Sequence, residues 1–337
     1  MSRVVGRLAP SPTGLLHLGN ARSLLLAWLG AKSVNGKIFL RVEDLLPDVD
    51  RHLPGMLEDL HWLGLECDPW AQPPGFMRQS ERKPIYDALL TALQARGRVY
   101  PCVCTRKDID LAARAPHRED QGLPYPGTCR GRFTNEHEAL EFEQQRARRE
   151  NRPPLGVALR MVVPETPVKF HDAFHGPQSV HLPSDCGDFV VRRKDGVAYM
   201  FAVVVDDVAM NVNQVVRGDD LLAATAQQLV VLQSLAELSS PILPGHFTPP
   251  QYIHVPLVLG DDGRRLAKRN QSLHLGALRQ EGMHAADLVA WLGRSLGLEE
   301  AGDVNMLARQ FAWEKVPKNP VIFGEAELRS VLGCHMT

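Results

Sequence analysis

The sequence predicts an α/β fold built on a parallel sheet and divided by an insertion of different composition. Strand-like apolar runs alternate with helical patterns before residue 97 and again after residue 188, as expected when crossover helices connect parallel strands. Between these parts, residues 98–187 are rich in Arg, Pro and Glu and contain the close-spaced cysteines. We therefore predict two halves of one parallel-sheet fold, an insertion between them and a helical tail.

The first half begins with a strand that leads into a helix. Residues 4–8 are typical of a short strand, and apolar side chains recur at helical spacing over residues 21–29. His17 and Gly19 therefore lie near the N-terminus of this helix. Such a terminus is favourable for phosphate, because its first N–H groups have no partner within the helix and the helix dipole is positive there.

The remaining elements follow from β-branched runs and from helical periodicity. Further strands are expected at residues 37–42, 188–192, 199–205, 213–217 and 252–258. Helices are expected at residues 84–95 and at about 222–238. Ligands of open parallel sheets bind at the carboxyl ends of the strands.

Composition is typical of a soluble globular enzyme. The 337 residues suggest two or three domains. The balance of 38 Lys and Arg against 39 Asp and Glu gives no overall basic charge, so any contact with RNA must come from local patches. We expect no signal peptide and no membrane contact, because the first motif begins at Arg7 and the longest apolar runs are far shorter than the roughly 20 residues that span a bilayer. A cytoplasmic location follows as a prediction.

The insertion contains a candidate metal site. Six cysteines in a chain of this size do not indicate a disulfide framework. Cys102, Cys104 and Cys129 instead resemble thiolate ligands of one structural zinc ion, which is usually four-coordinate. Three cysteines leave one position open, which the following residues could fill on chemical grounds: His117, His137 or Cys186. Cysteines buried only as small apolar side chains are the alternative.

Two short segments far apart in the chain look like the two halves of one ATP-binding site. They read His17-Leu-Gly-Asn20 and Arg265-Leu-Ala-Lys-Arg269. This pair resembles the class I aminoacyl-tRNA synthetases, and within them the glutamyl branch. The resemblance extends in order to about Leu275 through the motifs at residues 40–44, 78–82, 100–104, 201–207 and 216–220. Several ordered matches are far more specific than any one of them.

The resemblance implies that a substrate carboxylate attacks the α-phosphate of ATP and releases pyrophosphate. This reaction needs positioning and charge neutralisation and no protein nucleophile. The resemblance assigns catalysis to His17, Gly19 and Lys268, and ATP binding to His17, Gly19, Asn20, Arg265 and Lys268, with Mg²⁺ carried on the nucleotide. Three residues depart from the family pattern: Asn20 for His, Arg265 for Lys and Ala267 for Ser.

Amino-acid recognition is likewise implied by the resemblance. It points to glutamate and to Arg7, Leu8, Ala9, Pro10, Ser11, Glu43, Tyr199 and Arg217. The fork of an arginine donates two aligned bonds to a carboxylate, so Arg7 and Arg217 suit the two acid groups. Tyr199 could add a hydroxyl donor, and Glu43 suits the α-ammonium group. An internal ion pair, such as Arg41 with Asp44, is the alternative for such residues.

The resemblance also suggests a fourth zinc ligand. The Tyr125-x3-Cys129 spacing is similar to that of a truncated relative in which a tyrosine completes the site. The alternative is a tyrosine that packs beside the turn at Pro124 and Pro126.

Chain length distinguishes the candidate relatives. The stretch from Lys268 to Thr337 is too short for an anticodon-binding domain of about 100 residues. The chain therefore resembles the shorter paralogues, the glutamyl-Q tRNA(Asp) synthetase family, which activate glutamate without tRNA and attach it to queuosine in the anticodon of tRNA(Asp). Two alternatives remain open: a conventional glutamyl-tRNA synthetase that lacks its own anticodon-binding domain, and a catalytically inactive, zinc-containing RNA-binding protein. We expect a monomer.

The expected partners are therefore L-glutamate, ATP and queuosine-containing tRNA(Asp). Basic residues that could contact the RNA backbone are Arg130, Arg132, Arg192, Arg193 and the run at residues 146–149, although such runs are often solvated helix faces. The predicted domains are residues 1–97, the first half of the catalytic domain; 98–187, the zinc-containing insertion; 188–275, the second half with the Lys268 loop; and 276–337, a helical C-terminal domain.

Overall fold

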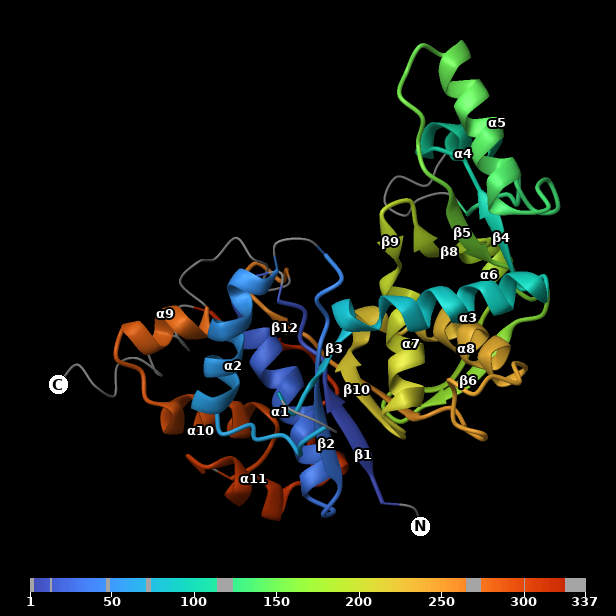
Figure 1. Ribbon diagram of the computed structural model, residues 1–337. Helices are drawn as coiled ribbons and strands as arrows, with labels where there is room; N and C mark the ends of the chain where they lie inside the picture. The colour runs from blue at the N-terminus through green and yellow to red at the C-terminus, as the bar shows by residue number, and fades with distance from the viewer. Residues whose placement is uncertain are drawn as a thin grey trace.

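The computed structural model describes residues 3–12, 14–46, 49–70, 74–113, 124–264, 274–299 and 301–324. Two lobes meet along a row of parallel strands (Figure 1). One lobe contains the N-terminal elements and the C-terminal helices, and the other contains the second half of the sheet and the insertion, whose far end extends away from the body.

Two neighbouring sheets carry the predicted parallel strands. The first has the order β1-β2-β3 with parallel pairing throughout: β1 (Val5–Leu8), β2 (Lys37–Val42) and β3 (Met77–Arg78). The second has the order β10-β11-β6-β7 and contains β10 (Gln214–Gly218), β11 (Gln251–Val255), β6 (Val168–Asp172) and β7 (Gly176–Val180). The two sheets are joined where the backbone N–H of Asn213 donates to the Val5 carbonyl at 3.0 Å.

Helices cross over between these strands, and those near residues 21–29, 84–95 and 222–238 confirm the sequence prediction. Those of the catalytic part are α1 (Leu18–Lys32), α2 (Leu53–Trp62), α3 (Lys83–Ala95), α7 (Tyr199–Ala209) and α8 (Ala224–Ala236). Short 3-10 turns lie at Asp50–His52, Gln79–Arg82, Asp219–Leu221 and Trp313–Lys315. The helix α1 is buried over most of its length, which explains its nearly continuous apolar sequence.

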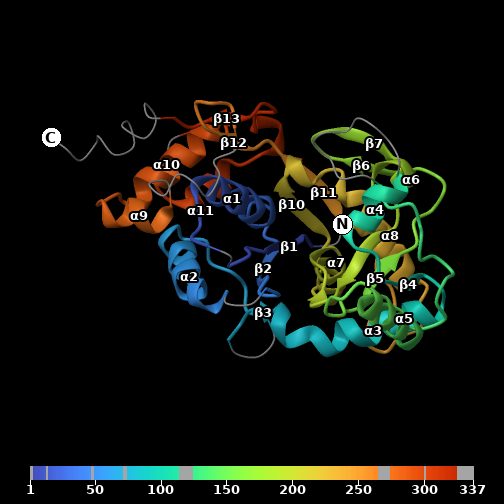
Figure 2. The ribbon, with the colours of Figure 1, turned by 90° about the horizontal axis from the view of Figure 1, so that it is seen from above.

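The C-terminal elements share one hydrophobic core with the first half. They are α9 (Leu275–Gln280), α10 (Ala285–Ser295) and α11 (Val304–Gln310), and their apolar side chains pack with those of α1 and α2. Figure 2 shows these helices beside α1 and α2. The strand β13 (Val321–Ile322) pairs in parallel with β12 (Val258–Leu259). A Cβ atom on Gly30 of α1 would lie 2.6 Å from the Trp313 ring, so the C-terminal segment packs directly on α1.

The insertion forms a small antiparallel sheet covered by helices, but its boundary differs from the predicted range 98–187. The sheet also takes in strands at residues 189–197, whereas the strands at residues 168–180 belong to the second sheet described above. The strands of the insertion have the order β4-β5-β8-β9: β4 (Val99–Cys102), β5 (Ala158–Met161), β8 (Phe189–Arg193) and β9 (Gly196–Val197). Its helices are α4 (Arg106–Ala113), α5 (Glu136–Arg149) and α6 (Leu182–Asp185). The side chain of Asn135 caps α5 by accepting from the Glu138 N–H at 2.9 Å.

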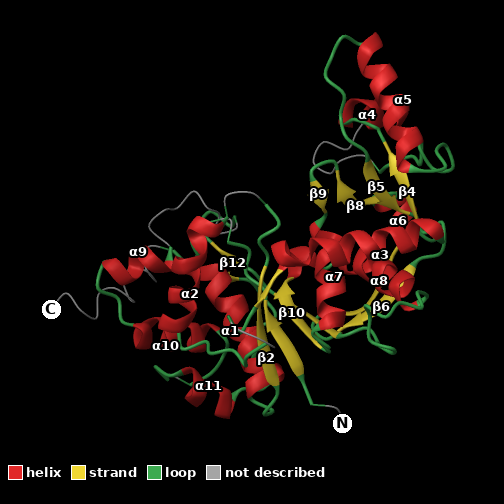
Figure 3. Cartoon of the chain, viewed as in Figure 1, coloured by secondary structure: helices red, strands yellow, loops and turns green. Residues whose placement is uncertain are grey.

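Two predictions of secondary structure were wrong. Residues 199–205, predicted as a strand, form the first part of helix α7, which Figure 3 shows among α3 and α8. A short run that is apolar on every side fits a buried strand or a buried helix equally well. Residues 188–192 do form a strand, but β8 belongs to the antiparallel sheet of the insertion and does not resume the parallel sheet.

Within the described ranges, no helix combines the length and the apolar character needed to cross a membrane.

Candidate active site

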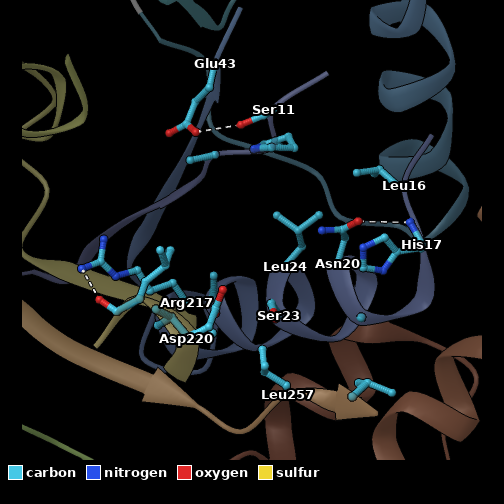
Figure 4. Close-up of a pocket in the computed structure, with 18 of the residues that line it drawn as sticks. Ser11, Leu16, His17, Asn20, Ser23, Leu24, Glu43, Arg217, Asp220 and Leu257 are labelled. Carbon is cyan, nitrogen blue, oxygen red and sulfur yellow. Dashed lines mark hydrogen bonds between the residues drawn. The ribbon is translucent and has the colours of Figure 1, made fainter. Parts of the chain in front are cut away.

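A cavity of about 560 Å³ opens at the carboxyl ends of β1 and β10, beside the N-terminus of α1 (Figure 4). From the predicted glutamate set, it is lined by Arg7, Ala9, Pro10, Ser11, Glu43, Tyr199 and Arg217. From the predicted ATP set, it is lined by His17, Gly19 and Asn20. Residues from three distant parts of the sequence therefore meet at one place, the edge of the sheet where ligands of such folds bind.

One residue of the predicted glutamate set does not line this cavity, and two residues of the predicted ATP set are not described. Leu8 is fully buried in the core and does not line the cavity, because successive side chains of a strand point to opposite faces. Arg265 and Lys268 lie outside the described residues.

The N-terminus of α1 holds the His17 side chain close to the helix backbone. His17 is the N-cap of α1, and its backbone N–H donates to Asn20 Oδ1 at 3.1 Å. A Cβ atom on Gly19 would lie 3.2 Å from the His17 imidazole, so the absence of a side chain leaves room for the ring. No acidic residue lies in the first turn of α1. The positive end of the helix is therefore not neutralised by its own first turn.

The chain after the second predicted motif returns to this helix end. His274, the first described residue after Lys268, forms an isolated antiparallel bridge with His17. The backbone N–H of Leu275 donates to the Leu16 carbonyl at 2.9 Å. The C-terminal flank of the Lys268 segment is therefore anchored beside the first motif.

Buried charges surround the other end of the cavity. Asp207 accepts a hydrogen bond from Arg41 and lies 3.5 Å from the Nε atom of Arg7. Arg41 also donates to Glu43 Oε1 at 3.0 Å, and Ser11 donates to Glu43 Oε2 at 3.0 Å. Burial raises the pKa of Glu43, against the opposing effect of Arg41. Burial lowers the pKa of Arg7, against the opposing effect of Asp207.

The alternative ion pair of Arg41 with Asp44 does not occur, because Asp44 pairs with Arg78.

Arg217 differs from the other two arginines. This residue is only 8% exposed. Across the described segments, no carboxylate lies within ion-pair distance of its guanidinium group, whereas Arg7 and Arg41 both face Asp207. A buried cation with no carboxylate in direct contact is costly unless a ligand supplies the negative charge. The cavity therefore contains an anion-binding group.

Several lining residues were not predicted. Ser23, Leu24 and Leu257 lie along the cavity, and Figure 4 shows Asp220 beside Arg217, across from His17. Asp220 lies in the motif at residues 216–220 and could have been added on that basis. The others carry no local signal, because a serine or leucine inside a helix or loop is typical of many surfaces.

A second site lies in the insertion. The Sγ atoms of Cys102, Cys104 and Cys129 lie within 4.8 Å of one another. The Tyr125 hydroxyl lies 3.4 Å from Cys102 Sγ and 3.6 Å from Cys104 Sγ, and it accepts a hydrogen bond from the Cys129 N–H at 2.9 Å. Four donor atoms from two segments therefore converge, as a four-coordinate metal requires.

The other candidates for the fourth ligand lie elsewhere or are not described. The His137 side chain is 80% exposed and faces Glu141. Cys186 accepts a hydrogen bond from Gln227 and is not part of the thiol cluster. His117 lies outside the described residues.

Arg160 lies against this cluster. Its Nε atom donates to Cys102 Sγ at 3.3 Å, and its guanidinium carbon lies 3.7 Å from the centre of the Tyr125 ring. The pKa of Cys102 is lowered by hydrogen bonds from Cys104 and Cys129 first, and then by Tyr125 and Arg160. Thiolate character of this kind favours metal binding.

Most of the predicted RNA-contacting arginines are engaged in ion pairs. Arg130 pairs with Asp188, Arg192 with Glu136 and Arg193 with Asp195. Arg146 pairs with Asp108 and Glu150. Arg132 instead lies over the Phe142 ring at 4.3 Å. The predicted contacts with the RNA backbone stay a prediction, because these pairs reduce the positive charge that the insertion offers.

Comparison with known proteins identifies relatives over nearly the whole chain. Residues 3–329 match the family described as tRNA synthetases class I (E and Q), catalytic domain. The chain is 46% identical over 300 residues to the Glutamyl-Q tRNA(Asp) synthetase of Nitratidesulfovibrio vulgaris, covering 87% of this chain and 86% of that relative. It is 40% identical over 329 residues to the Glutamyl-Q tRNA(Asp) synthetase of Symbiobacterium thermophilum, with 94% of each covered.

Longer relatives match over only part of their length. Glutamate--tRNA ligase 1 of Halorhodospira halophila is 37% identical over 338 residues, which cover 96% of this chain and 65% of the ligase. Among solved structures, a glutamate tRNA ligase from Elizabethkingia meningosepticum in complex with its amino acid superposes with a TM-score of 0.74 at 23% identity. That match covers 98% of this chain and 69% of the ligase. This likeness concerns the fold, and it agrees with the predicted fold class.

Proposed function

Because the chain belongs to the class I tRNA synthetases (E and Q), and within them to the glutamyl-Q tRNA(Asp) synthetases, we propose that it activates L-glutamate and transfers it to queuosine in the anticodon of tRNA(Asp). In the first step a glutamate carboxylate oxygen bonds to the α-phosphorus of ATP, and the bond to pyrophosphate breaks. In the second, a queuosine hydroxyl displaces AMP from the adenylate. The observation that carries the proposal is one cavity that joins a helix N-terminus to a buried, unneutralised arginine.

Glutamate fits the charged end of this cavity. Its two carboxylates suit the guanidinium groups of Arg7 and Arg217, which line the same space. Glu43 would receive the α-ammonium group, and Ser11, which already holds one Glu43 oxygen at 3.0 Å, would fix its orientation. Tyr199 and the backbone at Ala9 and Pro10 would complete the walls.

ATP fits the opposite end. The first turn of α1 offers N–H groups and a positive dipole end to the phosphates, and Gly19 lets the His17 ring lie close to the helix. The family uses ATP with Mg²⁺, which would lessen the negative charge of the phosphates. We assign Lys268 and Arg265 to the departing pyrophosphate, an assignment supported by the anchoring of the chain beside His17 at His274.

The thiol cluster fits one structural zinc ion. We propose Cys102, Cys104, Cys129 and Tyr125 as its ligands, because their donor atoms converge and Arg160 favours the negative charge of the sulfur and oxygen donors. The zinc would hold the segment around Tyr125 to the end of β4. It would have no part in the chemistry, because it lies in the insertion and no cluster residue lines the cavity.

The proposal is tested by ATP–pyrophosphate exchange with purified protein in the absence of RNA, followed by transfer of labelled glutamate. Exchange should depend on glutamate and should not require tRNA, and only queuosine-containing tRNA(Asp) should become labelled. Arg217→Ala should abolish most of the exchange. Arg3→Ala is a suitable control, because Arg3 is an exposed arginine just before β1 and does not line the cavity.

Two other outcomes would reject the proposal in different ways. Exchange that appears only with tRNA(Glu) would indicate a conventional glutamate–tRNA ligase. RNA binding without any exchange would indicate an inactive RNA-binding protein. We also expect a cytoplasmic monomer, which cell fractionation and light scattering of the purified protein can check.

A further inference from the structure

We propose that His254 and Asp172 are positioning residues that hold Arg217 in a fixed orientation while leaving its positive charge available to the substrate. This inference rests on the proposed role of Arg217 as a ligand of a glutamate carboxylate. His254 and Asp172 are both fully buried, and neither lines the cavity. They would therefore act through Arg217 and not on the reacting atoms.

The sheet register brings the three side chains together. In the parallel pair of β10 and β11, Arg217 is the direct partner of His254. The next strand is β6, and Asp172 at its end pairs with Tyr252 of β11, two residues before His254. The order β10-β11-β6 thus aligns a guanidinium, an imidazole and a carboxylate across three neighbouring strands. A shift of one residue in either pairing would place one of them on the other face.

The hydrogen bonds fix where the imidazole proton lies. The Nε atom of Arg217 lies 3.0 Å from His254 Nε2. An arginine can only donate, so Nε2 must accept and the ring proton must lie on Nδ1. Nδ1 lies 2.7 Å from Asp172 Oδ2, which accepts it. The bonds therefore run in one direction, from Arg217 to His254 to Asp172.

Both carboxylate oxygens of Asp172 accept hydrogen bonds. Oδ2 also accepts from the His254 backbone N–H at 3.1 Å, and Oδ1 accepts from the N–H groups of Phe174 and His175 at 2.9 Å. Burial raises the pKa of Asp172, but these hydrogen bonds outweigh it and the pKa is lowered. Burial lowers the pKa of His254, and Asp172 only partly opposes this. The carboxylate is ionised and the imidazole neutral.

The remaining contacts of Arg217 leave one edge of the guanidinium for a ligand. Its Nη2 atom donates to Thr225 Oγ1 at 2.7 Å, and the Tyr252 ring lies 5.8 Å from its central carbon. Its Nη1 atom has no hydrogen-bond partner among the residues that the structure describes. Nη2 also donates to the Leu221 carbonyl oxygen at 3.4 Å. The donors of Nε and Nη2 are thus used for orientation, and the donors of Nη1 stay available.

Because His254 is neutral, it can orient the guanidinium group of Arg217 without cancelling its positive charge. Asp207 contacts Arg41 and Arg7 directly and compensates their charge. The negative charge of Asp172 is instead kept behind the His254 ring, one side chain away from Arg217. A carboxylate in direct contact would compete with the substrate carboxylate, whereas a neutral acceptor does not. Metal ligands and catalytic side chains are likewise oriented by hydrogen-bond partners that do not themselves contact the metal or the substrate.

Two substitutions of similar polarity separate this role from simple core packing. The side-chain amide of Gln reaches the position of Nε2, so His254→Gln can still accept from Arg217. The amide of Asn reaches only the position of Nδ1, so His254→Asn can still donate to Asp172 but leaves Arg217 Nε without an acceptor. In glutamate-dependent exchange, His254→Asn should raise the KM for glutamate about tenfold or more, His254→Gln should raise it much less, and the KM for ATP should change little in both.

Thr225 provides a second pair of variants in case the histidine variants fold poorly, and its Oγ1 atom lies 3.2 Å from His254 Nε2. Thr225→Val keeps the shape but removes the acceptor for Arg217 Nη2, so the KM for glutamate should rise selectively. Thr225→Ser restores a hydroxyl and should restore the KM. Thermal unfolding of each variant shows whether it remains folded.

The outcomes distinguish this inference from the proposed function. If Arg217→Ala raises the KM for glutamate but His254→Asn and Thr225→Val do not, the positioning role is overturned while the proposed function stands. If the Asn and Gln variants raise both KM values equally and lower Tm together, the role of His254 is only structural and the inference is again overturned. If Arg217→Ala leaves the KM for glutamate unchanged, the proposed role of Arg217 fails, and the inference fails with it.

Discussion

Arg7 faces Asp207 at the base of the cavity: its Nε atom lies 3.5 Å from Asp207 Oδ1, the same oxygen that accepts a hydrogen bond from Arg41. Asp207 lies in α7, and the two arginines lie in β1 and β2. One carboxylate therefore ties the helix of the second half to both strands of the first half. Asp207 thus offsets the charge of two buried guanidinium groups, and Glu43 adds a second carboxylate to Arg41.

Asp207→Asn should therefore lower the free energy of unfolding by about 3 kcal/mol, since it leaves two buried cations with one fewer anion. Urea unfolding at neutral pH measures this loss. Asp50→Asn is the control, because Asp50 also pairs with an arginine, Arg78, but its side chain is 72% exposed. That exposed pair should contribute less than about 1 kcal/mol. Equal losses in the two variants would contradict the prediction.

Arg7→Ala should raise the KM for glutamate in exchange assays by roughly tenfold to a hundredfold, because a charged hydrogen bond to a carboxylate is lost in a buried cavity. The KM for ATP should change much less. Arg7→Lys should recover only part of the loss, since a lysine cannot present the arginine fork. An unchanged KM for glutamate in Arg7→Ala would remove Arg7 from the substrate site.

Cys129→Ser should lower the zinc content of protein purified without chelators, because it removes one of the converging thiols. Tyr125→Phe should weaken zinc binding without abolishing it, since three thiolates remain. Cys186→Ser is the matched control, because Cys186 lies outside the cluster. Competition with a chromophoric chelator gives the affinities. Wild-type affinity in Tyr125→Phe would show that Tyr125 is not a ligand.

Gly187→Ala should destabilise the insertion. Gly187 has φ +66, and a Cβ atom there would lie 2.1 Å from the Tyr125 carbonyl oxygen. Gly176 has φ +71, and a Cβ atom there would have no other atom within 4 Å, so Gly176→Ala carries the backbone strain alone, about 1–2 kcal/mol. Gly187→Ala should lose more stability than this in thermal unfolding, and it should also lose zinc. Equal stability and zinc content in the two variants would rule out the steric argument.

Asp59 should make stability depend on pH between about 4 and 6. Burial raises the pKa of Asp59 to about 6, and Arg279 only partly opposes this. The folded state thus holds the proton more tightly than the unfolded chain, whose aspartate titrates near 4. The contribution of Asp59 to the free energy of unfolding is therefore fully present below pH 4 and is lost as the pH rises through 6.

Asp59→Asn removes this titration. The stability of Asp59→Asn relative to wild type should therefore increase from pH 4 to pH 6 and stay constant above. Chemical unfolding at several pH values measures the difference. Glu66→Gln replaces an exposed carboxyl, so its stability should change with pH in the same way as that of wild type. Parallel profiles for Asp59→Asn as well would mean that Asp59 titrates normally.

Local patterns were sufficient for the parts of the fold that depend on neighbours in sequence. The strand at residues 5–8, the helix that begins after His17 and the strand at residues 37–42 follow from apolar periodicity, and the structure confirms them. The thiol spacing likewise predicted a cluster that could hold a metal, and the three sulfur atoms do converge. Predictions of this kind succeed because hydrophobic period and ligand chemistry are properties of short segments.

Long-range pairing decided the rest. Residues 199–205 form a helix and residues 189–193 join the antiparallel sheet of the insertion, and neither outcome is encoded in the run itself. The sequence by itself determined the α/β class, the helix end at His17 and the residue types at the site. Only the tertiary structure decided that Arg7 shares Asp207 with Arg41, while Arg217 rests on a neutral His254 backed by Asp172. The physical reason is that strand order and register, which bring residues about 40 to 200 positions apart into contact, are set by burial of the whole core and not by any local segment.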